Sequence, residues 1–159
     1  MHVSSITLSI ESEFKNMVLI GKAINSLCSL ADFSAIDTYQ MELCVVEAVN
    51  NAIEHAYDGQ QGHVLEIRFL LYHNKITIDV CDTGKVMHQQ LLLRENALPT
   101  FDAQDLHSLP EGGWGLAIMR QVMDEVTYHT CNGKNVLTLT KRFTSDNSAT
   151  GDHHALSAS

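Results

Sequence analysis

The chain reads Glu47-Ala48-Val49-Asn50-Asn51-Ala52-Ile53-Glu54-His55 along an expected helix that runs from a cap at Asp37 to about Tyr57. At ~100° per residue, its apolar and polar residues separate onto opposite sides. One side carries Val45, Val49, Ala52 and Ala56, and the other carries Glu47, Asn51, Glu54 and Asp58. The stretch therefore predicts an amphipathic helix, ended by Asp58-Gly59, with Glu47 and Asn51 one turn apart on its polar stripe.

This polar stripe has two interpretations. A solvated helix face explains Glu54 and Asp58, but it explains Asn51 less well, because asparagine is a weak helix former. An amide oxygen binds Mg²⁺, a hard cation, and a carboxylate one turn away is placed to accept a proton from an attacking hydroxyl. Asn51 is therefore a candidate Mg²⁺ ligand and Glu47 a candidate general base, whereas His55 fits a surface or capping position.

A second short motif, Asp82-Thr83-Gly84, follows a stretch that alternates like a buried strand. An acidic residue before a glycine often just begins a turn. The functional interpretation is a carboxylate that accepts a hydrogen bond from an exocyclic amine, with Gly84 allowing backbone to approach a ring closely. The motif alone leaves both interpretations open.

The third motif, Gly112-Gly113-Trp114-Gly115-Leu116, precedes an expected helix over 115–124. Its glycines form either a loose loop or a turn whose backbone N–H groups face phosphates at the helix start. The chain has no Gly-x-x-x-x-Gly-Lys-Ser/Thr sequence, which excludes the P-loop class. Between the second and third motifs, 87–111 has no periodicity and contains two prolines, as functional or mobile segments often do.

The remaining pattern predicts one α/β domain over 1–143. We expect a strand over 3–10, followed by a helix on which Phe14, Val18, Leu19, Lys22, Ile24 and Leu27 follow helical spacing. We also expect a hairpin of strands 65–71 and 76–81, and a second hairpin of 125–130 and 135–143 around Asn132-Gly133. The Ser-, Ala- and His-rich segment 144–159 has little to bury, and we expect a disordered tail.

Composition narrows the classes of partner. The formal net charge of −9 argues against nucleic acid as a direct partner, because phosphate backbones select basic surfaces. No apolar run approaches the ~20 residues of a membrane span, and a secretory signal is not evident. The four widely spaced cysteines predict buried reduced thiols in a cytoplasmic protein.

Together the three motifs resemble the conserved boxes of the histidine-kinase-like (GHKL) ATPases, and the chain from Ile6 to Arg142 is similar in size to the bacterial anti-sigma-factor serine kinases. The resemblance implies a two-layer α/β sandwich, a mainly antiparallel sheet with helices on one face. It assigns the general base to Glu47, the Mg²⁺ ligand to Asn51 and the adenine-binding acid to Asp82. Nucleotide-loop positions fall at Gly84, Gly113 and Gly115, and a mobile ATP lid at 87–111.

The resemblance also implies an activity. Kinases of this kind use ATP and Mg²⁺ to phosphorylate a serine of an anti-anti-sigma protein of the STAS type, and they sequester a sigma factor, usually as homodimers. A binding switch that holds ATP without transferring phosphate is the alternative; Glu47 favours the kinase, since a pure binder needs no base. A sensor histidine kinase is disfavoured, because only about forty residues precede the first motif, and they contain only His2.

Two positions depart from the family pattern. Val86 stands where a second glycine of the Asp82 motif is common, and Gly133-Lys134-Asn135 stands where the family often has Gly-Thr before its last strand. No threonine role is therefore carried over to this chain.

Overall fold

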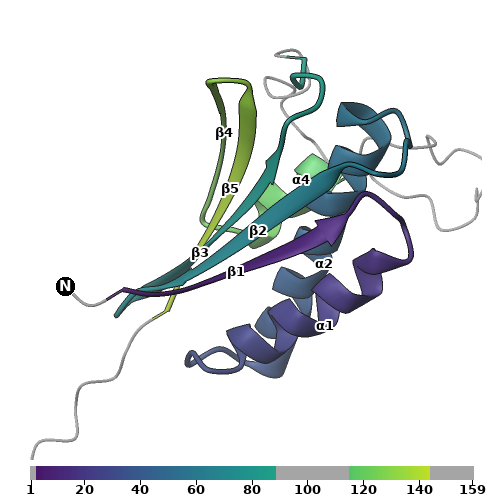
Figure 1. The fold of residues 1–159 in the computed structure, drawn as a ribbon. Coiled ribbons are helices and arrows are strands. Elements are labelled where there is room, and N and C mark those ends of the chain that lie inside the picture. The colour runs from purple at the N-terminus through teal and green to yellow at the C-terminus, as the bar shows by residue number, and fades with distance from the viewer. Residues whose placement is uncertain (1–2, 89–114, 144–159) are drawn as a thin grey trace, which may run out of the picture.

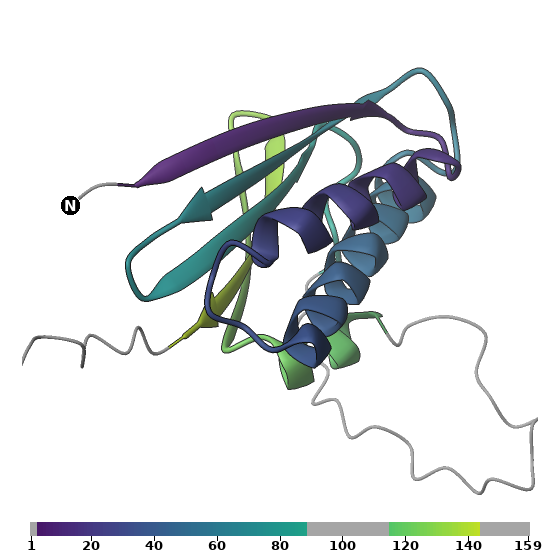
Figure 2. The ribbon, with the colours of Figure 1, turned by 90° about the horizontal axis from the view of Figure 1, so that it is seen from below.

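A computed structural model describes residues 3–88 and 115–143. These residues form two layers, one antiparallel sheet and a layer of helices on one of its faces (Figures 1 and 2). The predicted fold class is confirmed. Most of the irregular segment expected over 87–111, Gly113 of the third motif and the expected tail 144–159 lie outside the described residues.

The sheet has five strands in the order β1-β2-β3-β5-β4, and every neighbouring pair is antiparallel. The strands are β1 (Ser4–Glu11), β2 (Val64–Leu71), β3 (Lys75–Asp82), β4 (Glu125–Cys131) and β5 (Lys134–Arg142). Both predicted hairpins form. In the second, Asn132 and Gly133 have φ of 52° and 74°, the left-handed conformation that a two-residue hairpin turn requires.

The helices are α1 (Asn16–Cys28), α2 (Ala35–Asn51) with its π-helical continuation η1 (Ala52–Ala56), and α4 (Gly115–Val122). The predicted cap of the second helix was wrong: α2 begins after Ser34, whose Oγ accepts a hydrogen bond of 3.1 Å from the N–H of Asp37. Ser34 precedes the first turn, so its hydroxyl can accept from a backbone N–H of that turn. Asp37 already lies inside the helix and cannot serve as this cap.

The core lies between the sheet and the helices. Alternate residues of β2, β3 and β5 face the helices, and the most deeply buried include Ile67, Phe69, Ile78 and Leu139. From the helices, Ile24 and Val45 are fully buried against them. The inward-facing residues of the strands and those on the buried faces of the helices therefore form one apolar layer.

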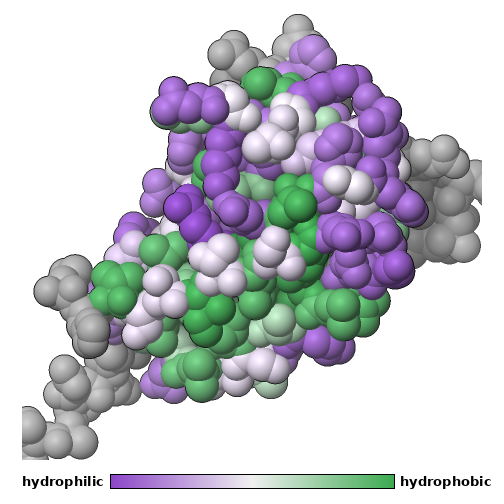
Figure 3. Space-filling view, viewed as in Figure 1, coloured by the Kyte–Doolittle hydropathy of each residue, from purple (hydrophilic) through white to green (hydrophobic). Residues whose placement is uncertain are grey.

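The first helix buries only part of the set of residues that its sequence pattern indicated. Ile20, Ile24 and Cys28 are buried, whereas Val18 and Leu19 are each 66% exposed. Figure 3 shows hydrophobic residues gathered in the lower part of the face that carries β1 and α1. Apolar side chains are thus left on the surface of this layer, within the described part of the chain.

The cysteines follow the prediction with one exception. Cys28, Cys44 and Cys81 are buried free thiols, and burial raises the pKa of Cys28 and Cys44 to about 12. Cys131 is exposed, because it ends the edge strand β4 just before the hairpin turn. Of the helices in the described ranges, none has the length and apolar character to cross a bilayer.

The capping geometry makes a stability prediction. Ser34→Ala removes the acceptor for the Asp37 N–H and is expected to lower the free energy of unfolding by ~1 kcal/mol, measured by urea denaturation. Ser29→Ala is the matched control, since that exposed hydroxyl only donates to the Ser26 carbonyl at the end of α1. Equal effects of the two changes would contradict the role of Ser34.

Candidate functional site

The side chains of Glu47 and Asn51 lie beside Gly115, the first residue of α4. A Cβ built on Gly115 would lie 3.0 Å from Glu47 Oε2 and 3.2 Å from Asn51 Nδ2, so the two side chains occupy the space beside this glycine. Any larger residue at position 115 would push against both polar groups. The structure therefore brings together three residues that lie in two separate sequence motifs.

The carboxyl of Glu47 is half-buried, which changes its acidity. Burial raises its pKa above the ordinary glutamate value, and the negative charge of Glu54 raises it further. Both effects disfavour the charged form. A carboxylate with a raised pKa is a stronger proton acceptor than an exposed one, as a general base requires.

Asn51 brings an amide to this place, and an amide oxygen is a hard ligand that suits Mg²⁺. The chemistry of Asn51 therefore fits a magnesium ligand. Within 3–88 and 115–143, no cluster of three or more His, Cys, Asp or Glu side chains is arranged to hold a metal by itself. His55 is exposed and only approaches Glu54, at 3.8 Å, consistent with a surface position.

The helix that carries Asn51 widens immediately after it. In η1 the N–H of Tyr57 bonds to the carbonyl of Ala52, five residues back, at 3.2 Å. The carbonyl of Ala56 then accepts a hydrogen bond of 2.9 Å from the N–H of Lys85. The π-helical turn thus links the end of this helix to the segment that follows β3.

Gly84 is required by this link. A Cβ on Gly84 would lie 2.3 Å from the carbonyl oxygen of Ala56, a distance that no side chain tolerates. The sequence suggested that Gly84 allows backbone to approach a ring. The close approach observed is to the helix backbone, because the loop after β3 packs directly on the end of η1.

Asp82 lies at the end of β3 and is 8% exposed. Its Oδ1 accepts two hydrogen bonds, one of 2.9 Å from the N–H of Gly84 and one of 2.7 Å from Nδ2 of Asn135. No described residue donates to Oδ2. Burial raises the pKa of Asp82, while the hydrogen bonds from Asn135 and Gly84 oppose that rise.

Sequence reasoning missed Asn135 as a site residue. It is 1% exposed and pairs directly with Asp82 across β3 and β5. A signal was present: along β5, Asn135 shares the inward face with Leu137 and Leu139, and a polar residue on a core face needs a partner. Its partner Asp82 lies 53 positions earlier in the chain, and the pairing of β3 with β5 brings the two residues together.

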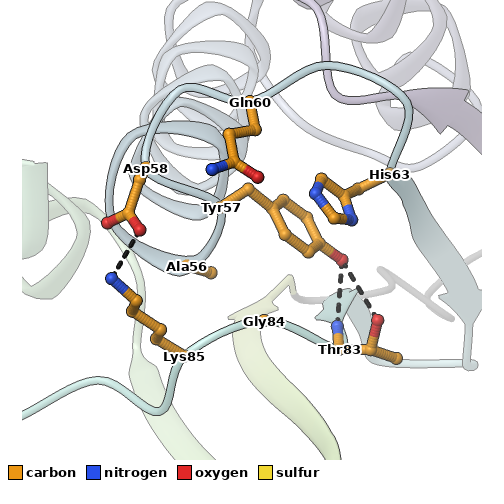
Figure 4. A pocket seen from close by; sticks show the side chains of 8 residues that line it. All are labelled: Ala56, Tyr57, Asp58, Gln60, His63, Thr83, Gly84 and Lys85. Atoms are coloured by element: carbon orange, nitrogen blue, oxygen red, sulfur yellow. Dashed lines mark hydrogen bonds and ion pairs between the residues drawn. The ribbon is translucent and has the colours of Figure 1, made fainter.

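Tyr57 was also missed. Its ring is buried and stacks on His63 at 4.3 Å, and its hydroxyl accepts from the N–H of Thr83 at 3.0 Å and donates to the carbonyl of Val64. Figure 4 shows this ring in a pocket of about 410 Å³ beside Gly84. The lining includes Gly84 but not Glu47, Asn51 or Asp82, so this pocket is separate from those three residues. Tyr57 supports the loop after β3 through the N–H of Thr83.

The Gly84 contact predicts a sharp local sensitivity. Gly84→Ala forces a Cβ against the Ala56 carbonyl and is expected to destabilise the fold by ~1–3 kcal/mol, the usual range for overpacking. Thr83→Ala is the control, because Thr83 is exposed and keeps its backbone hydrogen bond to Tyr57. Thermal unfolding of the two variants measures the difference. A Gly84→Ala protein as stable as wild type would show that the two segments do not pack this closely.

Comparison with known proteins agrees with this fold. Residues 10–141 match the model of the family described as the histidine kinase-like ATPase domain. The chain is 26% identical over 138 residues to the serine-protein kinase RsbW of Listeria monocytogenes serovar 1/2a, which covers 86% of each chain. It is 29% identical over 136 residues to RsbW of Bacillus pumilus, covering 84% of this chain and 83% of the relative.

A third relative, the serine-protein kinase RsbW of Halalkalibacterium halodurans, is 29% identical over 136 residues, covering 86% of this chain and 80% of its own. The family match includes β2 to β4, α2, α4 and β5 up to residue 141, and therefore spans every described site residue. This protein belongs to the histidine kinase-like ATPase domain family.

Proposed function

We propose that this protein is an ATP-dependent protein serine kinase that acts as an anti-sigma regulatory factor. It phosphorylates a serine of an anti-anti-sigma STAS protein and sequesters a sigma factor. The observation that carries the proposal is Glu47, a half-buried carboxyl with a raised pKa that lies beside Asn51 and Gly115. Membership in an ATPase family and relatives named as serine-protein kinases support it.

ATP is the substrate that donates the phosphate. Asp82 accepts a hydrogen bond from the adenine amine through Oδ2, which no described residue occupies. The backbone near Gly113 and Gly115 binds the phosphates at the start of α4, where N–H groups and the helix dipole favour anions. Asn51 contributes a ligand to Mg²⁺, which when bound neutralises charge on the phosphates.

The transfer step uses Glu47 as the base. Glu47 takes the proton of the substrate serine hydroxyl, the serine oxygen forms a bond to the γ-phosphorus, and the bond from that phosphorus to the bridging oxygen of ADP breaks. ADP leaves with the electron pair of that bond. A raised pKa suits Glu47 to hold the transferred proton until it is released to water.

A non-catalytic ATP-binding switch is the alternative function. It would need Asp82 and the phosphate-binding glycines, but a carboxyl at position 47 would then have no chemical task. Glu47 instead lies half-buried with its charged form disfavoured, and carboxyls with such perturbed acidity cluster at catalytic sites. This observation favours the kinase.

The proposed partners are proteins. We propose that the chain works in the cytoplasm as a homodimer. The exposed apolar side chains on α1 and β1, among them Val18, Leu19 and Ile6, offer surface for protein contacts. The net charge of −9 disfavours direct contact with nucleic acid.

The kinase proposal is tested at Glu47. Glu47→Gln removes the proton acceptor but keeps the size of the side chain, so phosphate transfer to a STAS substrate from labelled ATP is expected to fall by ~10²–10⁴-fold. Binding of ADP, followed by calorimetry, is expected to change little, because Glu47 acts on the hydroxyl. Glu54→Gln, on the same stripe, is the control and should retain activity well above the pKa of Glu47. Transfer at wild-type speed by Glu47→Gln would refute the base assignment.

The pKa of Glu47 makes a separate prediction. Only the deprotonated carboxyl accepts a proton, so kcat/KM is expected to fall as pH drops through the raised pKa of Glu47. Glu54→Gln removes a negative charge that raises this pKa, and the acid limb of the pH profile should therefore move to lower pH. Asp58→Asn, which removes another carboxylate of the stripe, is the matched control. Superimposable limbs for wild type and Glu54→Gln would rule out this coupling.

A further inference from the structure

Asn135 has an orientation that its neighbours dictate. Its Nδ2 faces Asp82 Oδ1 at 2.7 Å, the carbonyl of Gly84 at 3.1 Å and the carbonyl of Lys85 at 3.5 Å. All three are acceptors, so only the amide nitrogen, a donor, fits on this side. The other end, Oδ1, accepts a hydrogen bond of 2.9 Å from the hydroxyl of Thr130 on β4. The side chain is therefore held from both ends.

This orientation of Asn135 gives the two carboxyl oxygens of Asp82 different hydrogen-bond partners. Oδ1 receives donors from Asn135 and from the Gly84 N–H, which occupy it. Oδ2 receives none from any described residue. A carboxylate anchored through one oxygen keeps a single rotamer and presents the other oxygen as an acceptor. Asp82 therefore offers one acceptor in a fixed direction.

The protonation state of Asp82 decides which purine it recognises. An ionised carboxylate only accepts, and it pairs with a 6-amino group. A protonated carboxyl also donates, and it pairs with a 6-oxo group. Burial favours the protonated form of Asp82, and the donors on Oδ1 favour the ionised form. Two basic side chains close to Asp82 or Asn135 in the sequence are paired elsewhere, Lys85 with Asp58 and Lys134 with Glu66.

Glu47 lies on α2, which packs against the sheet. Among the described residues, neither Glu47 nor another acidic group on the helices is a cause of the pKa shift of Asp82. Asn135 is thus the side chain, besides the Gly84 backbone, that opposes the effect of burial.

We propose that Asn135 is a positioning residue that holds Asp82 as an acceptor-only carboxylate, with Oδ2 turned to the base, and so sets the preference for 6-amino over 6-oxo purine nucleotides. The inference rests on the proposed function, in which Asp82 receives the adenine amine. Asn135 does not touch the base itself; it acts through Asp82.

The test compares ADP with inosine diphosphate, whose base has a 6-oxo group in place of the 6-amino group and a hydrogen on the neighbouring N1. Calorimetry gives their dissociation constants from neutral pH down to the lowest pH at which the protein stays folded, for wild type and for Asn135→Leu. Leucine keeps the number and branching of the side-chain heavy atoms and removes the donor. The wild type is expected to prefer ADP. In Asn135→Leu the preference should fall by about tenfold, as expected for loss of a hydrogen bond to a charged group. The pH at which it is half-lost should also rise by about one unit.

Two further variants keep the result interpretable. Asn135→Ser is the second test variant, because serine ends one bond short of the amide nitrogen and introduces no apolar group beside the Gly84 carbonyl. Thr138→Val is the matched control: Thr138 lies on the same strand and its hydroxyl also donates to a carboxylate of β3, Asp79 Oδ1, at 2.7 Å, but on the other face of the sheet. It should leave both the preference and its pH dependence unchanged.

The outcomes separate this inference from the proposed function. A smaller preference with a shifted pH midpoint in the Asn135 variants, and not in Thr138→Val, supports the inference. Equal losses of affinity for both nucleotides, with the ratio and midpoint unchanged, would reduce Asn135 to a structural residue and overturn it. A wild type that binds the two diphosphates equally would contradict the role of Asp82 as the adenine acceptor. The proposals about Asp82 and Asn135 would then fail together.

Discussion

The packing of Gly84 on the carbonyl of Ala56 is the contact on which the rest of the site depends. It is close enough to exclude any Cβ, and it is reinforced by the hydrogen bond from the Lys85 N–H to the same carbonyl. Ala56 ends the helix that carries Glu47 and Asn51, and Gly84 follows Asp82 by two residues. One backbone contact therefore joins the half of the site on α2 to the half at the ends of β3 and β5. Because reacting groups must be held within about an ångström, such a rigid joint matters for catalysis.

The π-helical turn makes this joint possible. A regular α-helix would have continued the bonding pattern of α2, whereas η1 shifts the last turn so that its N–H groups bond five residues back. The Ala56 carbonyl is then left to face the loop after β3. Turns of this kind are frequent at functional sites, where one extra residue redirects a helix end. Tyr57, which follows immediately, braces the same loop through the Thr83 N–H.

The two acidic residues of the site are prepared for different tasks by their surroundings. Glu47 is half-buried, close to the charge of Glu54, and its pKa is raised, which suits a group that must take up a proton. Asp82 is more deeply buried, but two donors on one oxygen oppose the rise of its pKa and hold its direction. The surroundings thus suit the same functional group to the proposed role of proton acceptor in one place and of hydrogen-bond acceptor in the other.

The sequence by itself determined the elements and the motif residues. Period-2 alternation predicted the strands, the Asn132-Gly133 turn predicted the second hairpin, and the polar stripe of α2 placed Glu47 and Asn51 one turn apart; these are local properties of neighbouring residues. Only the tertiary structure decided which face of α1 is buried and that Gly84 is required by a helix end. It also paired Asn135 with Asp82, since residues far apart in the chain meet only when β5 takes its place beside β3. Which groups become partners across a sheet is set by strand order and register, and no local pattern encodes these.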